Sequence, residues 1–481
     1  YYTLVSRHVS TIMSSFQYTI TSLVGNFGRL WRPGHESFTA GSSSSARRIL
    51  QVQGAGATTY LQGLITCDLL AAPTPPREEV VDPAAVTAAA VEDNASSTPP
   101  VEFSDKLRSA CFLDSKGRIL TDSLLWKIDE TKYYVDVPED TADQLLAHMK
   151  QFILRRSKVK VVDASEEMAS HVVYGTLNAQ NTPEGFLSAV DPRHPCLGLR
   201  ILSLTPEATA QLEPMMKSAF PTSPGTYRVV RKLAGVAEGS ELQGKIAGET
   251  NQEFLNAVSF SKGCYLGQEL TARVQYTGAI RKRVMPVLLM DLNMELPRPW
   301  LLASQIQQGR TPTDLLDEAS VTRSVIPRLP RLSPSAAASI VGMMSGPASN
   351  SSEDDEETKG DYDKKAALQL AAQSVALMEG LQQLQAGDKM VDSQDGKTIG
   401  QIIAPPEPGT NVVLAQMRLD KVGLLGDGVW THTNKVKVGD LGELRYLPYL
   451  PLWWPEIDPK SGKAKEPNDD EDDGEEEEEL D

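Results

Sequence analysis

The most constraining feature of the chain is a twelve-residue stretch, KGCYLGQELTAR, that places a cysteine among glycines and charged residues. Gly263 and Gly267 flank Cys264 and allow a sharp turn or a close approach to a ligand. We expect the cations Lys262 and Arg273 to lower the pKa of the Cys264 thiol and to favour the thiolate. Such a cysteine indicates a nucleophile or a soft metal ligand. A cysteine packed as a small hydrophobe beneath a tight turn is the alternative.

The residues around this stretch carry further short motifs. Residues 227–287 include GVAEG, LNAVSF and GAIRKR. Together with the twelve-residue stretch, they resemble the YgfZ-type branch of the glycine cleavage T-protein (GcvT) superfamily, folate-associated proteins that help to mature iron-sulfur clusters. The stretch itself matches the core motif of that family completely. The preceding AGETNQE, residues 247–253, departs from the family pattern at four positions, one of them conservatively.

Three other segments share the resemblance. YLQGLITCDL is similar to the first helix of the family, CFLDSKGRILTDSLLW to the strand, turn and strand that follow, and DGKTIGQIIAPPEPGTNVVLAQMRL to its closing barrel strands. These segments are residues 60–69, 111–126 and 395–419. The resemblance implies an α+β fold, in which two interleaved α/β lobes surround a central pocket and a C-terminal β-barrel closes it.

Hydrophobic periodicity also indicates an α+β class. Alternation of apolar and polar residues predicts strands at residues 133–138 and 159–164. The spacing over residues 141–154 predicts an amphipathic helix that is capped by Thr141 or Asp140. Short strands with glycine turns in the last third of the chain predict a small barrel.

Shifts in composition divide the chain. We expect four parts: a presequence-like disordered segment (1–48), a lobe domain (49–282), a barrel domain (283–455) and an acidic disordered tail (456–481). Proline-rich and acid-rich composition predicts loop insertions over about 71–105 and about 293–386. The second insertion ends in leucines spaced as one helical face, which we expect to pack on their own domain or to meet a partner: Leu370, Leu377, Leu381 and Leu384.

The N-terminal composition is typical of a mitochondrial presequence. The first 48 residues contain five arginines, many serines and threonines, and one acidic residue, Glu36. We therefore expect the protein in the mitochondrial matrix; an extension without a targeting role is the alternative. No apolar run is long enough to span a membrane, so no membrane span is expected.

The net charge of −17 is concentrated in two short runs. Residues 469–481 contain eleven acidic residues and no base, and residues 353–363 contain seven with one lysine. Without these runs the chain is nearly neutral, so its acidity says little about a substrate. Such runs are typically solvated and disordered, and an acidic docking tail is the alternative.

Cysteine usage limits the metal chemistry. Four cysteines occur without a C-x-x-C pair: Cys67, Cys111, Cys196 and Cys264. This spacing excludes a local zinc ribbon and a disulfide framework and suits a reducing compartment. A four-cysteine cluster has no complete ligand set here. If Cys264 binds a cluster, a partner or a small thiol must supply the other ligands.

The first functional hypothesis is an iron-sulfur cluster assembly factor. In it, Cys264 transiently binds iron or a cluster, or attacks a sulfur species, while an A-type scaffold protein provides the remaining cysteines. The resemblance implies a role in maturing four-iron clusters, as a monomer or a heterocomplex. Gln268 and Glu269 would orient the loop or the partner, and Arg273 would pair with Glu269 or meet an anionic ligand. The full set of expected cofactor-binding residues is Lys262, Gly263, Tyr265, Gly267, Gln268, Glu269, Arg273 and Glu238.

The second hypothesis is a tetrahydrofolate-dependent aminomethyltransferase, and a third is regulatory folate binding without turnover. The T-protein pattern has an aspartate doublet where this chain has Thr121 and Asp122. A hydroxyl does not replace a carboxylate as a base at neutral pH, so the transfer chemistry looks impaired, and Asp122 is expected to be a structural acceptor. By family analogy, Arg193, Arg200 and Glu238 face the central pocket.

Other candidates carry weaker signals. His194 and Cys196 have a spacing that suits a metal, but the two prolines around them favour a rigid turn. His148 carries no functional signal. The basic run at residues 281–283 is too short for a nucleic-acid footprint, and an aromatic content of 6% offers no stacking platform, so nucleic-acid binding is not expected.

Overall fold

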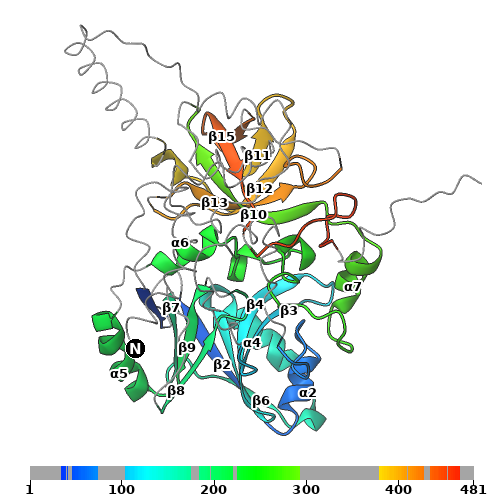
Figure 1. Ribbon diagram of the computed structural model, residues 1–481. Helices are drawn as coiled ribbons and strands as arrows, with labels where there is room; N and C mark the ends of the chain where they lie inside the picture. Colours follow the sequence, from blue (N-terminus) through cyan, green and yellow to red (C-terminus); the bar gives the residue numbers. More distant parts are fainter. Residues whose placement is uncertain are drawn as a thin grey trace, which may run out of the picture.

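The computed structural model places two layers of sheet and helix beneath a barrel (Figure 1). It describes residues 34–39, 41, 46–73, 103–174, 184–194, 197–219, 225–292, 377, 379–408, 410–426, 434–451 and 453–465. The mixture of helices with two open sheets and a closed barrel confirms the α+β prediction. None of the helices among these residues is long and apolar enough to cross a membrane.

The larger open sheet has five antiparallel strands in the order β3-β4-β5-β2-β6. The strands are β2 (Arg47–Gln53), β3 (Leu107–Leu113), β4 (Ile119–Asp129), β5 (Lys132–Pro138) and β6 (Lys160–Asp163). Strand β2 pairs with both β5 and β6, which brings a segment near the start of the chain into the middle of the sheet. The strands predicted at residues 133–138 and 159–164 are confirmed as β5 and β6.

Helices α2 (Ala57–Gln62) and α4 (Glu139–Gln151) cover this sheet. Helix α4 confirms the predicted amphipathic helix, and its apolar face reaches the sheet through Leu145 and Met149, both 0% exposed. Thr141 accompanies them as a buried polar residue whose Oγ1 donates to the Pro138 carbonyl across 3.2 Å. This helix therefore begins directly at the end of β5.

The second open sheet has four strands in the order β1-β7-β9-β8. The strands are β1 (Gly34–Phe38), β7 (Ala169–Tyr174), β8 (Phe186–Val190) and β9 (Leu199–Ser203), and helix α5 (Pro206–Ala219) follows them. In Figure 1 this sheet lies beside the larger one. The two sheets form the two α/β lobes expected from the resemblance.

The predicted boundary of the presequence-like segment is wrong. We expected disorder up to residue 48, yet β1 pairs with β7 over its whole length and β2 starts at Arg47. Phe38 is 1% exposed and packs edge-on against Tyr227 across 5.4 Å. Burial of these side chains outweighs the arginine- and serine-rich composition, so the folded part includes residues 34–38. Residues 1–33, 40 and 42–45 of this segment lie outside the described residues.

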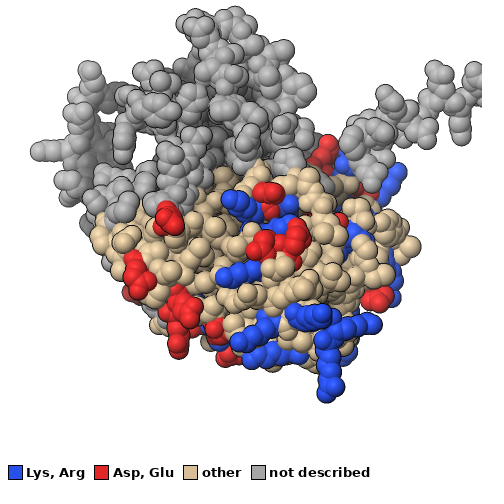
Figure 2. Space-filling model, turned by 90° about the horizontal axis from the view of Figure 1, so that it is seen from below, with Lys and Arg blue, Asp and Glu red and all other residues tan. Residues whose placement is uncertain are grey.

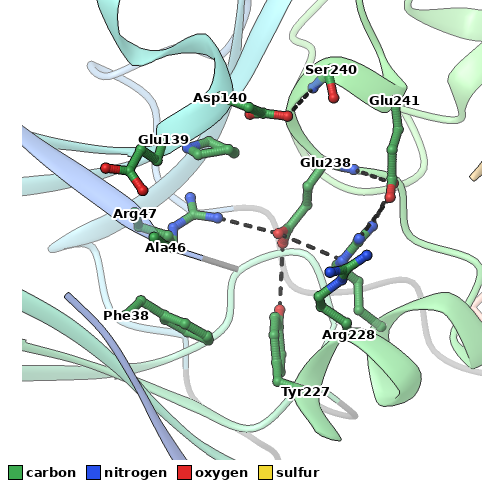
Figure 3. A pocket seen from close by; sticks show the side chains of 12 residues that line it. Phe38, Ala46, Arg47, Glu139, Asp140, Tyr227, Arg228, Glu238, Ser240 and Glu241 are labelled. Carbon is green, nitrogen blue, oxygen red and sulfur yellow. Dashed lines mark hydrogen bonds and ion pairs between the residues drawn. The ribbon is translucent and has the colours of Figure 1, made fainter. Parts of the chain in front are cut away.

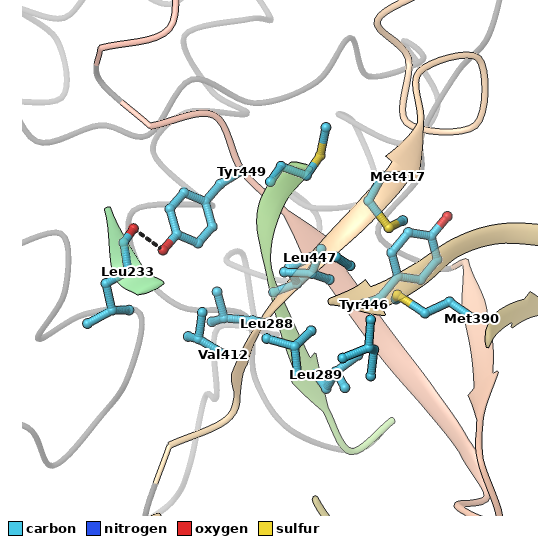
Figure 4. Packing of buried hydrophobic residues seen from close by; sticks show 14 of the residues in the cluster. Leu233, Leu288, Leu289, Met390, Val412, Met417, Tyr446, Leu447 and Tyr449 are labelled. Atoms are coloured by element: carbon cyan, nitrogen blue, oxygen red, sulfur yellow. Dashed lines mark hydrogen bonds between the residues drawn. The ribbon is translucent and has the colours of Figure 1, made fainter. Parts of the chain in front are cut away.

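The C-terminal barrel is closed by six strands in the order β10-β13-β12-β11-β14-β15. They are β10 (Lys282–Met290), β11 (Lys389–Asp392), β12 (Thr398–Ala404), β13 (Val412–Arg418), β14 (Lys435–Val438) and β15 (Glu443–Pro448). Residues 293–376, which cover most of the predicted second insertion, lie outside the described part. Figure 4 shows the apolar side chains that converge in this barrel.

Helix α6 (Thr226–Leu233) joins the barrel to the lobes. The Tyr449 hydroxyl donates to the Leu233 carbonyl across 2.7 Å, and Trp453 Nε1 donates to the Ala234 carbonyl across 2.7 Å. The leucines Leu377, Leu381 and Leu384 are buried in the same cluster, which confirms that this part of the predicted helical face packs on its own domain. Leu370 lies outside the described residues.

The predicted start of the acidic tail also needs correction. Residues 456–465, expected to be disordered, form a turn closed by a bridge between Ile457 and Ala464. Arg283 Nε donates to the Gly462 carbonyl across 3.0 Å, and its guanidinium lies 4.2 Å from the Phe254 ring centroid. A buried arginine that needs acceptors thus holds this segment against β10. The acidic residues 469–481 lie outside the described part.

Candidate functional site

The cysteine motif lies on a loop that leads into helix α7 (Gln268–Tyr276). Gly267 precedes the helix with a φ of 79°, a left-handed conformation that favours glycine. A Cβ added there would lie 2.5 Å from the Asp114 carbonyl oxygen, and one added at Gly117 would lie 2.6 Å from the Gly267 carbonyl oxygen. The β3–β4 turn therefore packs directly on the start of α7, and Gly267 takes the turn role predicted for it. Gly263 differs, because a Cβ there would meet open space.

Cys264 is exposed on this loop, whereas Cys67 and Cys111 are buried. The alternative of a cysteine packed beneath a tight turn is therefore wrong. Cys196 lies outside the described residues. Among the described side chains, no group of three or more His, Cys, Asp or Glu residues is arranged to hold a metal ion.

Lys262 anchors the loop to the C-terminal side of helix α2. Its Nζ donates to the carbonyls of Gln62, Ile65 and Cys67, across 2.9, 2.7 and 2.8 Å. The ammonium also lies 4.7 Å from the Tyr265 ring centroid. Burial lowers the pKa of Lys262 to about 8, although nearby Cys67 and Asp68 raise it. We predicted Lys262 as a cofactor contact, but its three donors are used by the backbone.

The other motif residues divide into loop-shaping and exposed side chains. The Tyr265 N–H donates to Gln268 Oε1 across 2.8 Å, so Gln268 orients the loop as expected. Tyr265 is partly buried, and burial raises its pKa to about 12. Glu269 and Arg273 are both exposed on α7. The predicted ion pair between them does not occur among the described contacts, which leaves both side chains toward solvent.

The central pocket is a cavity of about 310 Å³ between the two lobes and helix α6. Figure 3 shows Glu238 at its centre, with Arg47 and Tyr227 pointing toward the carboxylate. Glu238 contacts Arg193 Nη1 across 2.5 Å and Arg47 Nη1 across 3.2 Å. The full lining is Phe38, Ala46, Arg47, Pro138, Glu139, Asp140, Tyr227, Arg228, Arg231, Glu238, Ser240 and Glu241. Glu238 thus faces the pocket as the family analogy implied.

Arginines fix the charge of this carboxylate. Burial by itself raises the pKa of Glu238, but Arg193, Arg47 and Arg231 together hold it well below its usual range. Arg193 Nη2 also pairs with Asp191 across 2.8 Å, and Arg200 Nε reaches the same carboxylate across 2.8 Å. Both arginines predicted near the pocket are therefore inside its ion-pair network, and Arg193 touches Glu238 directly.

The two residues in place of the aspartate doublet are both buried. Thr121 Oγ1 shares a hydrogen bond of 2.7 Å with Thr141 Oγ1. Asp122 Oδ1 accepts the Gly239 N–H across 2.7 Å, which agrees with the expected structural role. Burial, then the Glu238 charge, raise the pKa of Asp122 to about 6, while Arg47 and Arg193 oppose the shift. Asp122 therefore supports the backbone beside Glu238.

The remaining histidine predictions fit a structural role. Burial lowers the pKa of His194 to about 4. The ring of His148 lies 4.9 Å from the ring of Phe152, and burial lowers its pKa too. Neither is part of a metal-binding group among the described residues.

Several pocket residues had no individual signal in the sequence. Arg47 fell within the presequence-like segment, and Glu241 resembled an ordinary surface acid. Tyr227 and Arg231 are four residues apart on α6, so they share a helix face. That spacing was the available signal, because a face with an aromatic and a cation can line a polar cavity.

Two α/β lobes around a polar pocket, a closed barrel and an exposed cysteine on a glycine turn are the features that the resemblance to the YgfZ-type branch of the GcvT superfamily implied. No family model matches the chain. It is 30% identical over 263 residues to the protein named "Iron-sulfur cluster assembly factor IBA57 homolog, mitochondrial" of Pyricularia oryzae, covering 53% of this chain and 58% of that protein. The relative of the same name in Chaetomium globosum is 32% identical over 270 residues, covering 51% and 55%.

These findings confirm the predicted resemblance: the chain is a homologue of proteins named as mitochondrial iron-sulfur cluster assembly factors. It spans somewhat more than half the length of these relatives. A solved structure, the glycine cleavage system aminomethyltransferase T from Bartonella henselae, aligns with a TM-score of 0.48 at 9% identity, covering 90% of this chain and 88% of that one.

Proposed function

We propose that the chain is a mitochondrial iron-sulfur cluster assembly factor that supports maturation of four-iron four-sulfur proteins in the matrix. Cys264 acts as a transient ligand of iron or of the cluster. The observation that carries this proposal is the exposure of Cys264 on a loop that is fixed from both sides. Lys262 binds three backbone carbonyls before it, and Gly267 packs on the β3–β4 turn after it. The names of the relatives support the same role.

The remaining ligands come from a partner. Iron in such clusters is held by thiolates, and the described residues contain no group of three or more His, Cys, Asp or Glu side chains that could hold a metal ion. We infer that an A-type scaffold protein brings the cluster with its own cysteines, and that Cys264 replaces one of its ligands during transfer. The exposed side of α7, with Glu269 and Arg273, is free to contact such a partner.

We further propose that the central pocket binds tetrahydrofolate without turning it over. The ring of this cofactor presents N–H donors, from which an ionised Glu238 can accept hydrogen bonds. Its glutamate tail needs a cation such as Arg228, whose side chain is 25% exposed at the rim and pairs with Glu407 across 2.7 Å. When bound, the cofactor would supply one-carbon chemistry. The chain's own groups give that chemistry little support, because Thr121 replaces a carboxylate and Asp122 is committed to the Gly239 N–H. For this reason we rank the aminomethyltransferase second among the candidate functions.

An anaerobic titration tests the proposal. The full chain is mixed with an A-type scaffold that carries a cluster, and visible absorption and the mass of the complex by size exclusion are followed. We expect a coloured heterocomplex with the wild type and with Cys67→Ala, whose thiol is buried, but none with Cys264→Ser. A colourless, unassociated wild type would reject direct ligation. Turnover of tetrahydrofolate with an aminomethyl donor would then favour the transferase.

A further inference from the structure

A basic surface lies at the end of the larger sheet that is farthest from the barrel. It begins after α4, where the 3₁₀ helix Arg155–Ser157 connects to β6. Its cations are Lys132, Arg155, Arg156, Lys158 and Lys160, which we call the basic end. Figure 2, seen from below, shows Lys and Arg side chains gathered on this face. Four of the five lie within six consecutive residues of a chain whose net charge is −17.

The fold holds these cations in place. Gln53 pairs with Lys132 on one side and with Lys160 on the other, so all three side chains point to the same side of the sheet. Lys158 adopts a left-handed conformation with a φ of 48°, which is uncommon for a residue with a side chain. Its carbonyl packs so closely on Gly54 that a Cβ there would lie 1.8 Å away. The basic end is therefore a fixed feature of the sheet edge.

Four of the five cations of this surface are not paired with acids of the described part of the chain, whereas Lys132 lies beside the exposed acids Asp129 and Glu130. Among the described residues, Arg155, Arg156 and Lys160 make no ion pair, and neither does Lys158. Nearby Arg48 shows the contrast, because it pairs with Asp143 across 2.6 Å and also contacts Asp163. The exposed cations therefore keep their full attraction for an anionic surface, apart from screening by salt.

Exposed apolar side chains accompany the cations. Leu154, directly before Arg155, is 53% exposed, and Ile128 is 40% exposed. The register between β4 and β5 shifts between Lys127 and Asp129, so Ile128 is left out of the regular pairing of these two strands. The adjoining turn lies beside the basic end, because the Gly54 N–H donates to the Thr131 carbonyl across 2.8 Å. Apolar groups among cations suit a bilayer interface, where they enter the region below the headgroups.

We propose that the basic end docks the protein on an anionic phospholipid bilayer. The cations bind the headgroups, and Leu154 and Ile128 insert at the interface. Anionic lipid fits this surface better than nucleic acid, whose phosphates would gain nothing from exposed leucine and isoleucine. In Figure 1 the barrel lies at the other end of the molecule and α7 lies to one side, so docking leaves the loop that leads into α7 accessible. The proposal is independent of the role of Cys264.

Co-sedimentation with vesicles tests this docking. The full chain is mixed with vesicles of phosphatidylcholine, alone or with phosphatidylglycerol as about a third of the lipid, at low and at physiological salt. Each cation near an anionic surface contributes about fivefold to binding, so Arg155→Gln/Arg156→Gln/Lys158→Gln should weaken binding to anionic vesicles by at least tenfold. Leu154→Ser should weaken it about threefold to tenfold with an unchanged salt dependence.

A matched control removes the same charge elsewhere. Lys282→Gln/Lys389→Gln/Lys437→Gln changes three exposed cations of the barrel, and it should bind like the wild type. The arginines of residues 1–33 are the same in the wild type and in all variants, so they cannot cause a difference in vesicle binding between them. Equal binding by the triple variant of the basic end and by the wild type would overturn the proposal. So would a wild type that ignores anionic vesicles but binds poly-glutamate through the same residues, because the partner would then be an acidic protein.

Discussion

The central pocket and the cysteine loop are built in opposite ways. In the pocket, Glu238 is surrounded by arginines, and Arg47 and Arg193 also pair with Asp136 and Asp191. On the loop, the backbone is fixed by Lys262 and Gly267, while Cys264 is exposed and belongs to no metal-binding group of three or more ligands among the described residues. The ion pairs of the pocket form within the protein, whereas a metal site on the loop needs ligands from another molecule. Substitutions should therefore affect stability in the pocket and partner chemistry on the loop.

The largest loss of stability is expected from Glu238→Gln. Removing this charge leaves Arg47, Arg193 and Arg231 buried without their shared acid, and breaking such a network costs about 3–5 kcal/mol. The free energy of unfolding in urea measures the effect. Glu269→Gln, which removes an exposed acid of α7, should change that energy by less than about 0.5 kcal/mol. Equal effects of the two substitutions would break the contrast between pocket and loop.

Asp122 should make the stability of the pocket depend on pH in the acidic range. Its pKa is about 6 in the fold, above the ordinary value of 3.8, so the folded state holds a proton that the unfolded state releases. The stability from this group is full below pH 3.8 and is lost as the pH rises through 6. By linkage the difference is about 2–3 kcal/mol at most.

Asp122→Asn checks this sign. The amide oxygen can still accept the Gly239 N–H, but the group no longer titrates. Compared with the wild type, the variant should gain stability between pH 4 and pH 7, as measured by urea unfolding at about these two values. If the difference in the free energy of unfolding between the wild type and the variant is the same at both pH values, Asp122 is ionised throughout this range.

The residues of these two regions differ in how well the sequence predicted them. The loop was predicted from one continuous stretch, because Gly267, Gln268 and Cys264 are near neighbours along the chain. The pocket draws on distant segments, since Arg47 and Glu238 are 191 positions apart and meet only after the sheets form. Composition was misleading for Arg47, because arginine and serine are typical of presequences. Tertiary pairing of β1 and β2 overrode that signal.

The anchor of the loop was missed for a related reason. Lys262 was predicted to sit beside the thiol or a cofactor, because a cation near a cysteine often has that role. Its actual acceptors are main-chain carbonyls of Gln62, Ile65 and Cys67, about 200 positions earlier. Backbone acceptors carry no signature in the sequence. The fold class was easier to predict from the sequence, because hydrophobic periodicity and the closing barrel strands both depend on local patterns of residues.

A smaller loss of stability is expected at the two glycines of the loop, and it differs between them. Gly267→Ala meets both a φ of 79° and the Asp114 carbonyl, so it should lower the free energy of unfolding by about 1–3 kcal/mol. Gly263→Ala meets open space and should leave that energy within about 0.5 kcal/mol. Thermal unfolding of both variants measures the two changes in stability. A larger effect at Gly263 would mean that the loop is packed elsewhere than on the β3–β4 turn.

The smallest effect on stability is expected from Cys264→Ser, although its effect on cluster binding should be the most complete. The side chain is exposed, and surface substitutions of this kind change the free energy of unfolding by less than about 0.5 kcal/mol. The same preparation should fail to form the coloured complex with the cluster-loaded scaffold. Urea unfolding and the visible absorption of one sample test both statements together. If the variant instead unfolds more easily in proportion to its loss of cluster, Cys264 supports the loop, and the separation between a self-sufficient pocket and a partner-dependent loop no longer holds.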